Sequence, residues 1–138
     1  MYAELYQAIE DRLTGLGLAN VSPALGGDPP LPACQPYFIG DKAAQVNTTK
    51  FRELIFGVKV TVGHFEQPGA AQNEAMTLLD TIRAGCDKWQ PENIHGLQGP
   101  VRVRDIRIED FRDHGSTVYL VLLAVRVIPA VFQKTLRS

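Results

Sequence analysis

The sequence has few of the residues that mark a metal centre, a disulfide framework or a membrane anchor. Its 138 residues include two cysteines, two methionines and one tryptophan. Cys34 and Cys86 fit no metal-binding or redox spacing. We expect Cys86 to be a buried packing residue, whereas Cys34 is either an inert surface thiol or an interface residue. The longest apolar run, residues 118–125, is far shorter than the roughly 20 residues that span a bilayer. We therefore expect a soluble protein with no membrane partner.

Motifs for phosphate binding and nucleophilic catalysis are also missing. Neither G-x-x-x-x-G-K-[ST] nor G-x-G-x-x-G occurs, and the Pro-Gly turn at residues 68–69 lacks the lysine and second glycine of a phosphate-binding loop. No serine stands in a G-x-S-x-G context. Of the three histidines, only His64 has a second candidate ligand nearby, Glu66, whereas catalytic zinc needs three converging ligands. We expect no cofactor, no metal and no enzymatic activity.

Hydrophobic periodicity predicts two amphipathic helices. Apolar residues recur at helical spacing in residues 2–16 and again in residues 71–89. The first stripe comprises Leu5, Tyr6, Ile9, Leu13 and Leu16, and the second comprises Ala71, Ala75, Leu78, Leu79, Ile82, Cys86 and Trp89. Since each helix has one apolar side, we expect both to cover the same sheet.

Two-residue alternation predicts the strands of that sheet. Every even position in residues 54–62 is apolar, which is typical of a strand with one buried face. Five prolines and two glycines in residues 22–36 indicate a loop or arm. Residues 101–131 resemble a long hairpin, with a bulge or a strand boundary at Arg104–Asp105 and a turn at 113–116. The predicted fold is α+β in a single domain, residues 1–138: a mixed, mostly antiparallel sheet of four to six strands with two helices packed on one face.

The second face of this sheet is the main functional clue in the sequence. Residues 118–125 are apolar on both sides of the strand, yet two helices can cover only one face. Other copies of the chain are the preferred cover, and the Pro-rich arm is the alternative. Residues 1–100 hold seven Lys/Arg against eleven Asp/Glu, and residues 101–138 hold seven against four. This split suits head-to-tail contact between copies, although the two charges also simply average out in solution.

The clearest basic feature is a set of arginines in the last third of the chain: Arg102, Arg104, Arg107 and Arg112. Acidic residues lie between these arginines, and no aromatic residues on which bases could stack alternate with them. The set is therefore only a weak indication of nucleic-acid binding. We predict that these arginines contact another subunit or a partner.

Two other classes of function remain open. A small metal-dependent, nuclease-like enzyme would need the acidic residues of the hairpin and a histidine to converge: Asp105, Glu109, Asp110 and His114. Cross-strand charge pairing on a solvated face explains the same residues without catalysis. A dimeric adaptor or binding module would instead use the second face of the sheet.

The order of the elements also resembles a known family. An N-terminal helix ("YAELYQAIEDRL") is followed by a Pro-rich loop and short strand ("PACQPYFIGD"), a strand, turn and helix ("ELIFGVKVTVG", then "NEAMTLLDTIRAGC"), and a closing hairpin ("VRDIRIEDFRDHGSTVYLVLLAVRV"). Over nearly its full length this pattern is similar to bacteriophage tail terminator proteins, also called tail completion or minor tail proteins.

The resemblance implies a structural protein of the virion tail, assembled in the host cytoplasm. Family members form a ring, typically a hexamer, that caps the tail tube, stops its polymerisation and docks the head-completion protein. The implied partners are other copies of the chain, the tail tube protein and the head-completion protein, with DNA only as cargo. We expect a monomer or a labile oligomer in isolation. The resemblance also assigns partner contacts to two loops and their residues His64, Phe65, Glu66, Asp113 and His114.

Overall fold

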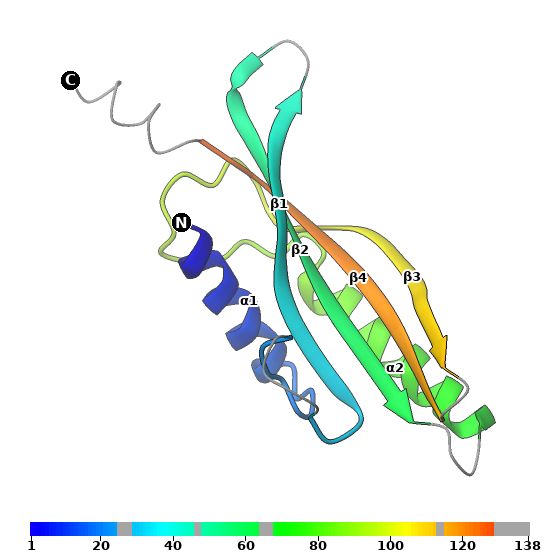
Figure 1. Cartoon of the computed structure of the whole chain (residues 1–138). Helices are drawn as coiled ribbons and strands as arrows, with labels where there is room; N and C mark the ends of the chain where they lie inside the picture. Colours follow the sequence, from blue (N-terminus) through cyan, green and yellow to red (C-terminus); the bar gives the residue numbers. More distant parts are fainter. Residues whose placement is uncertain (25–28, 46–47, 64–67, 113–114, 129–138) are drawn as a thin grey trace.

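The computed structural model describes residues 1–24, 29–45, 48–63, 68–112 and 115–128, with the backbone alone at 43–45, 48–51, 68, 71 and 110–112. The elements are α1 (Tyr2–Gly15), β1 (Ala33–Gln45), β2 (Thr48–Gly63), α2 (Pro68–Cys86), β3 (Arg102–Arg112) and β4 (Ser116–Val127). All described strand pairs are antiparallel, and the sheet has the order β1-β2-β4-β3 (Figure 1). This confirms the predicted α+β fold. Neither described helix combines the length and apolarity needed to cross a membrane.

Both helices pack on one face of the sheet, as the two stripes predict. The even residues of β2 from Leu54 to Val62 are at most 1% exposed. The first four of these, from Leu54 to Val60, share one hydrophobic core with the inward side chains of both helices, which are Leu5, Ile9 and Leu13 of α1 and Leu79, Ile82 and Cys86 of α2. β4 is an inner strand, in agreement with its predicted central place.

The C-terminal ends of the two helices meet at a glycine. A Cβ atom on Gly85 of α2 would lie 2.4 and 2.5 Å from the two Cδ atoms of Leu16, so a larger residue here would require the leucine side chain to move. The Nε of Arg12 donates a hydrogen bond of 2.9 Å to the carbonyl oxygen of Gly85. The same guanidinium lies 5.2 Å from the centre of the Trp89 ring. These contacts fix the relative position of α1 and α2.

The first strand begins earlier than the proline content predicts. Residues 33–36, the end of the expected loop, already belong to β1, and Pro36 pairs with Val58. A proline is tolerated here because β1 is an edge strand, whose outward N–H groups have no partner in the sheet. β1 and β2 then continue together past the end of β4 and project as a hairpin beyond the sheet (Figure 1).

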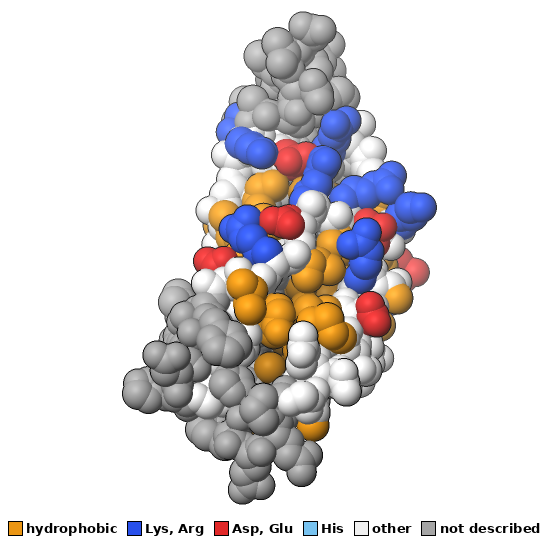
Figure 2. Space-filling view, turned by 90° about the vertical axis from the view of Figure 1, so that its right-hand side faces the viewer, with side chains coloured by type: hydrophobic (Ala, Val, Ile, Leu, Met, Phe, Trp, Pro, Cys, Tyr) orange, Lys and Arg blue, Asp and Glu red, His pale blue; other side chains and the backbone are white. Residues whose placement is uncertain are grey.

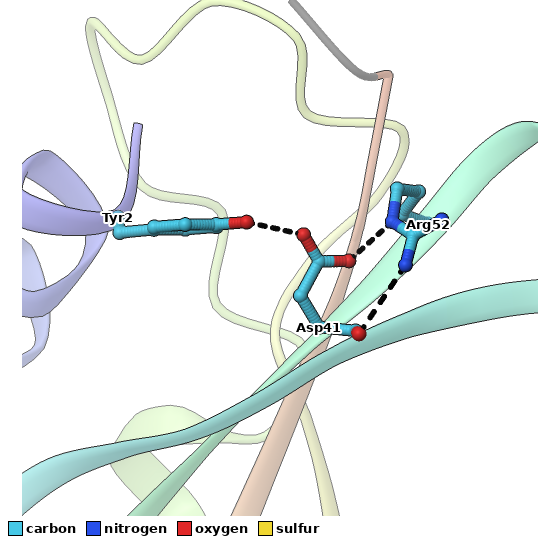
Figure 3. Close-up of polar contacts among 3 residues, drawn as sticks. All are labelled: Tyr2, Asp41 and Arg52. Atoms are coloured by element: carbon cyan, nitrogen blue, oxygen red, sulfur yellow. Dashed lines mark hydrogen bonds and ion pairs between the residues drawn. The ribbon is translucent and has the colours of Figure 1, made fainter.

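The base of this hairpin is tied to the start of α1. The hydroxyl of Tyr2 donates to the carboxylate of Asp41, which also pairs with the guanidinium of Arg52 (Figure 3). Tyr2 stacks on Phe38 with ring centres 5.0 Å apart, and Phe38 meets Phe56 edge to face at 5.4 Å. The N-terminal turn of α1 is thereby anchored on β1.

The two edge strands are irregular, whereas the inner pair is regular. β1 changes register after Phe38 and again after Ala43, and β3 does so after Val103 and after Ile108. The change at Val103 confirms the predicted bulge near Arg104. By contrast, β2 and β4 pair without interruption from Arg52↔Val127 to Gly63↔Ser116.

Candidate functional site

The sheet face turned away from the helices, called here the open face, is the candidate functional site. Its hollow centre is apolar and its border is basic. The centre is formed by Ile39, Ile55, Leu120 and Leu122, and the border by Lys42, Arg104, Arg107 and Arg126. We call this hollow the open-face groove. Figure 2 shows such a face, with apolar side chains in the middle and Lys and Arg side chains above and to the right of them.

The open face covers part of itself. A Cβ on Gly57 would lie 2.8 Å from the Cζ of Tyr37, so the tyrosine ring lies directly over this glycine. Burial raises the pKa of Tyr37, the carboxylate of Glu109 raises it further, and the guanidinium of Arg107 lowers it. Leu120 is only 4% exposed in the single chain. The open face therefore exposes less apolar surface than its sequence predicts. Ile39 is an exposed apolar side chain on it, with 44% of its surface accessible.

One buried carboxylate organises the upper part of the face. Glu53 is 7% exposed and accepts a hydrogen bond of 2.8 Å from Nη2 of Arg104. The ammonium of Lys42 lies 3.8 Å away, and Arg126 stands opposite Glu53 in the β2–β4 register. Arg126 has no carboxylate within 4.0 Å among the described residues. The single negative charge thus fixes Arg104 and leaves an excess of positive charge.

The acidic residues of β3 are engaged with an arginine. Nη1 of Arg107 lies 3.0 Å from Asp105, and its Nε lies 3.5 Å from Glu109. No cluster of three possible metal ligands occurs in the part of the chain that the structure describes. Asp105 and Glu109 therefore form ion pairs along one strand, as the charge-pairing interpretation predicts, although that interpretation placed the pairs across strands. The other two residues of the enzyme alternative, the Asp110 side chain and His114, lie outside the described residues.

Three of the four predicted contact arginines gather on this face. Arg102 and Arg104 line one hollow together with Arg126, and Arg104 and Arg107 line the open-face groove. For Arg112 the structure describes only the backbone, at the end of β3. The remaining predicted contact residues, His64, Phe65, Glu66, Asp113 and His114, lie outside the described residues.

Other contributors to the face escaped the sequence-based prediction. Lys42 and Ile39 come from β1, in a segment interpreted as a short extended piece followed by polar residues. Arg126 belongs to the apolar strand β4, where a lone charge gives little signal. Strand pairing is what brings these residues beside the arginines of β3. The pairing of Lys42 with Glu53 also depends on the register change after Ala43, which no local pattern in the sequence encodes.

The helical side of the molecule has the opposite charge. α1 and α2 together carry five carboxylates, Glu4, Glu10, Asp11, Glu74 and Asp80, and two arginines, Arg12 and Arg83. Among the described strand side chains that face away from the helices are six cations, Lys42, Lys59, Arg102, Arg104, Arg107 and Arg126, and three carboxylates, Glu53, Asp105 and Glu109. Asp41 and Asp87 also line the hollows at this face, where Asp41 pairs with Arg52 and Asp87 accepts a hydrogen bond from the backbone N–H of Val103. The charge split seen along the sequence thus becomes a split between two opposite faces, −3 on the helices and +3 on the sheet.

The two cysteines lie in the interior and not at this face. Cys34 and Cys86 are 1% and 0% exposed. Burial raises the pKa of each thiol to about 11. Cys86 is the packing residue that its place on the helical stripe predicts. Cys34 is also a packing residue, so neither of the two alternatives considered for it, a surface thiol or an interface residue, is correct for the single chain.

Comparison with known proteins identifies the fold. No protein-family model and no curated protein sequence matches this chain. A chain in the solved structure described as the virion of a native gene transfer agent (GTA) particle is similar over nearly its whole length, with a TM-score of 0.57 and 14% sequence identity. The similarity covers 91% of this chain and 95% of that chain. At this identity it establishes that the two chains share a fold.

Proposed function

We propose that this protein is a structural component of a phage-type particle, and within that class a tail terminator that closes the tail tube as a ring. The observation that carries the proposal is the near-complete match of the whole fold to a chain of a gene transfer agent virion. Because the match covers 95% of that chain, it concerns an entire subunit and not a shared supersecondary motif.

The two charged faces support an assembly role. A ring requires a heterologous interface, in which one surface of a subunit meets a different surface of the next. This chain has an acidic helical side and a basic open face. The helical side of one copy therefore attracts the open face of another, whereas two helical sides or two open faces repel each other. The faces point in opposite directions because both helices lie on one side of the sheet (Figure 1). Such a subunit is suited to head-to-tail association.

Tail length provides the direct test of the terminator role. The gene is deleted from the genome that produces the particle, and tails are measured by electron microscopy with and without a plasmid copy. If the chain ends tube growth, the deletion broadens the length distribution and leaves heads and tails unjoined, and the plasmid copy restores both. Tails of normal, uniform length joined to heads in the deletion strain would refute the proposal.

Association in solution gives a second, independent test. A ring that forms only on a finished tube is expected to be monomeric or labile when isolated. Light scattering across a wide concentration range should therefore give the monomer mass of 15.2 kDa at low concentration and reversible growth above it. A dimer of constant mass at all concentrations would favour the adaptor alternative.

A further inference from the structure

The open-face groove combines an apolar centre with a basic border, and this combination restricts its occupant. Ile39 and Leu122 offer apolar surface between the cationic groups of Lys42, Arg104 and Arg126. A nucleic-acid backbone would pair with the cations but leave the apolar centre unused. An acidic segment with an exposed apolar side chain would satisfy both parts.

The outer side of α2 has these properties. An exposed stripe at helical spacing runs along it and comprises Asn73, Met76, Thr77, Asp80, Arg83 and Ala84, with one cation, Arg83, at its C-terminal end. Met76 is 43% exposed, and Glu74 lies beside the stripe. Among the described residues, neither Glu74 nor Asp80 has a cation within 4.0 Å. The stripe therefore offers an apolar centre and two carboxylates available to an outside partner.

The outer side of α1 is a poorer match, although it is also acidic. Glu4 lies 3.4 Å from the N-terminal ammonium, and Asp11 accepts a hydrogen bond of 2.9 Å from Gln7. Its exposed aromatic residue, Tyr2, is held by Asp41 and stacked on Phe38. The polar and apolar groups of α1 thus already have partners within the chain.

We propose that α2 of one copy binds in the open-face groove of the next copy, with Met76 over Ile39 and Leu122, and Asp80 facing Arg126 and its neighbours. The inference deepens the proposed function and rests on it, since it names the contact through which a ring would close. The contact is heterologous, because α2 and the groove lie on opposite sides of the sheet. An open chain of copies therefore keeps one free α2 at one end and one free groove at the other until it closes.

Cysteine cross-linking tests this contact, since the native thiols are buried and their pKa is raised to about 11. An Ile39→Cys protein is mixed with a Met76→Cys protein that carries a mass tag, and a short bis-maleimide traps transient contacts. We expect a heterodimer at several times the yield of either protein alone. The matched control replaces Ile39→Cys by Ile108→Cys, which is 52% exposed but lies outside the groove.

Charge reversal makes the test specific. Arg126→Glu in the Ile39→Cys protein should lower the heterodimer yield at least about fivefold, and Asp80→Arg in the Met76→Cys protein should restore it. The proposal would be overturned if the heterodimer yield equalled that of the Ile108→Cys control, or if Ile39→Cys formed homodimers in place of heterodimers. It would also be overturned if duplex DNA bound in the groove and thereby prevented the cross-link. Specific cross-linking together with normal tails in the deletion strain would refute the terminator role and leave this interface standing. A broad distribution of tail lengths in the deletion strain, together with no specific cross-link, would support the terminator role and refute this interface.

Discussion

The junction between the two helices allows a stability prediction that follows directly from interatomic distances. Replacing Gly85 by alanine places a Cβ atom 2.4 and 2.5 Å from the Cδ atoms of Leu16 and 3.0 Å from its Cγ. Carbon atoms pack best at about 3.5–4.0 Å, so the outer atoms of the Leu16 side chain must move away by roughly 1 Å. Overpacking of this kind costs about 1–3 kcal/mol. Alanine regains about 1 kcal/mol because its helix propensity exceeds that of glycine.

We therefore expect Gly85→Ala to lower the free energy of unfolding by about 1 kcal/mol and the Tm by about 3–5 °C. Gly15→Ala is the control, because Gly15 ends α1 and has nothing within 4 Å of its would-be Cβ. This control should be neutral or stabilising. Urea unfolding followed by circular dichroism measures both.

A double variant separates the overlap from other causes. In a Leu16→Ala background the added methyl group at position 85 has room, so the same glycine-to-alanine change should become neutral or stabilising. A coupling energy of about 1 kcal/mol or more between the two positions is expected for side chains in contact. The reasoning is refuted if Gly85→Ala stabilises the wild-type chain as much as Gly15→Ala does, or if the two changes are additive.

Two further predictions concern buried groups. Glu53→Gln removes the charge that holds Arg104 and Lys42, and we expect urea unfolding to show a loss of about 1–3 kcal/mol. The thiols of Cys34 and Cys86 ionise near pH 9 when unfolded but near pH 11 when folded, so their contribution to native stability should be constant below pH 9 and fall as the pH rises to 11. The fall should be about 2–3 kcal/mol per thiol.

Each of these has its own control. Glu109→Gln changes an exposed carboxylate at 3.5 Å from Arg107 and should alter stability by less than about 0.5 kcal/mol. An equal effect of the two glutamine variants would contradict the role assigned to Glu53. For the thiols, the Cys34→Ala, Cys86→Ala double variant should lose most of the decline between pH 9 and 11. Rapid reaction of the wild-type protein with a thiol reagent at pH 8 would show that the sulfur atoms are accessible.

Local periodicity was sufficient to predict the helices and the inner strands. Every even residue from Leu54 to Val62 is apolar, and Leu54, Phe56 and Val58 are each buried against the helices as this period of two indicates. The start of β1 was not predictable in this way, because Pro36 normally argues against a strand. Only its position at an edge, a property of the whole sheet, makes it acceptable.

The candidate site was predictable only in part for the same reason. The arginines of β3 were identified because they are close together in the sequence. Lys42 and Arg126 join them through strand pairing, and no local pattern encodes which residues become neighbours across strands. The cover that Tyr37 gives to Gly57 likewise depends on register, so the sequence overstated how much of the second face is bare.

The register changes in β1 and β3 have a consequence for how copies of this chain meet. Both outer strands are interrupted twice, and a strand with such interruptions is a poor template for hydrogen bonding to another sheet. Unlimited lateral growth into fibres is thereby discouraged even when many molecules crowd together. The number of subunits in an assembly then depends on the angle between two surfaces of one molecule. A suitable angle closes the assembly into a ring after a fixed number of subunits.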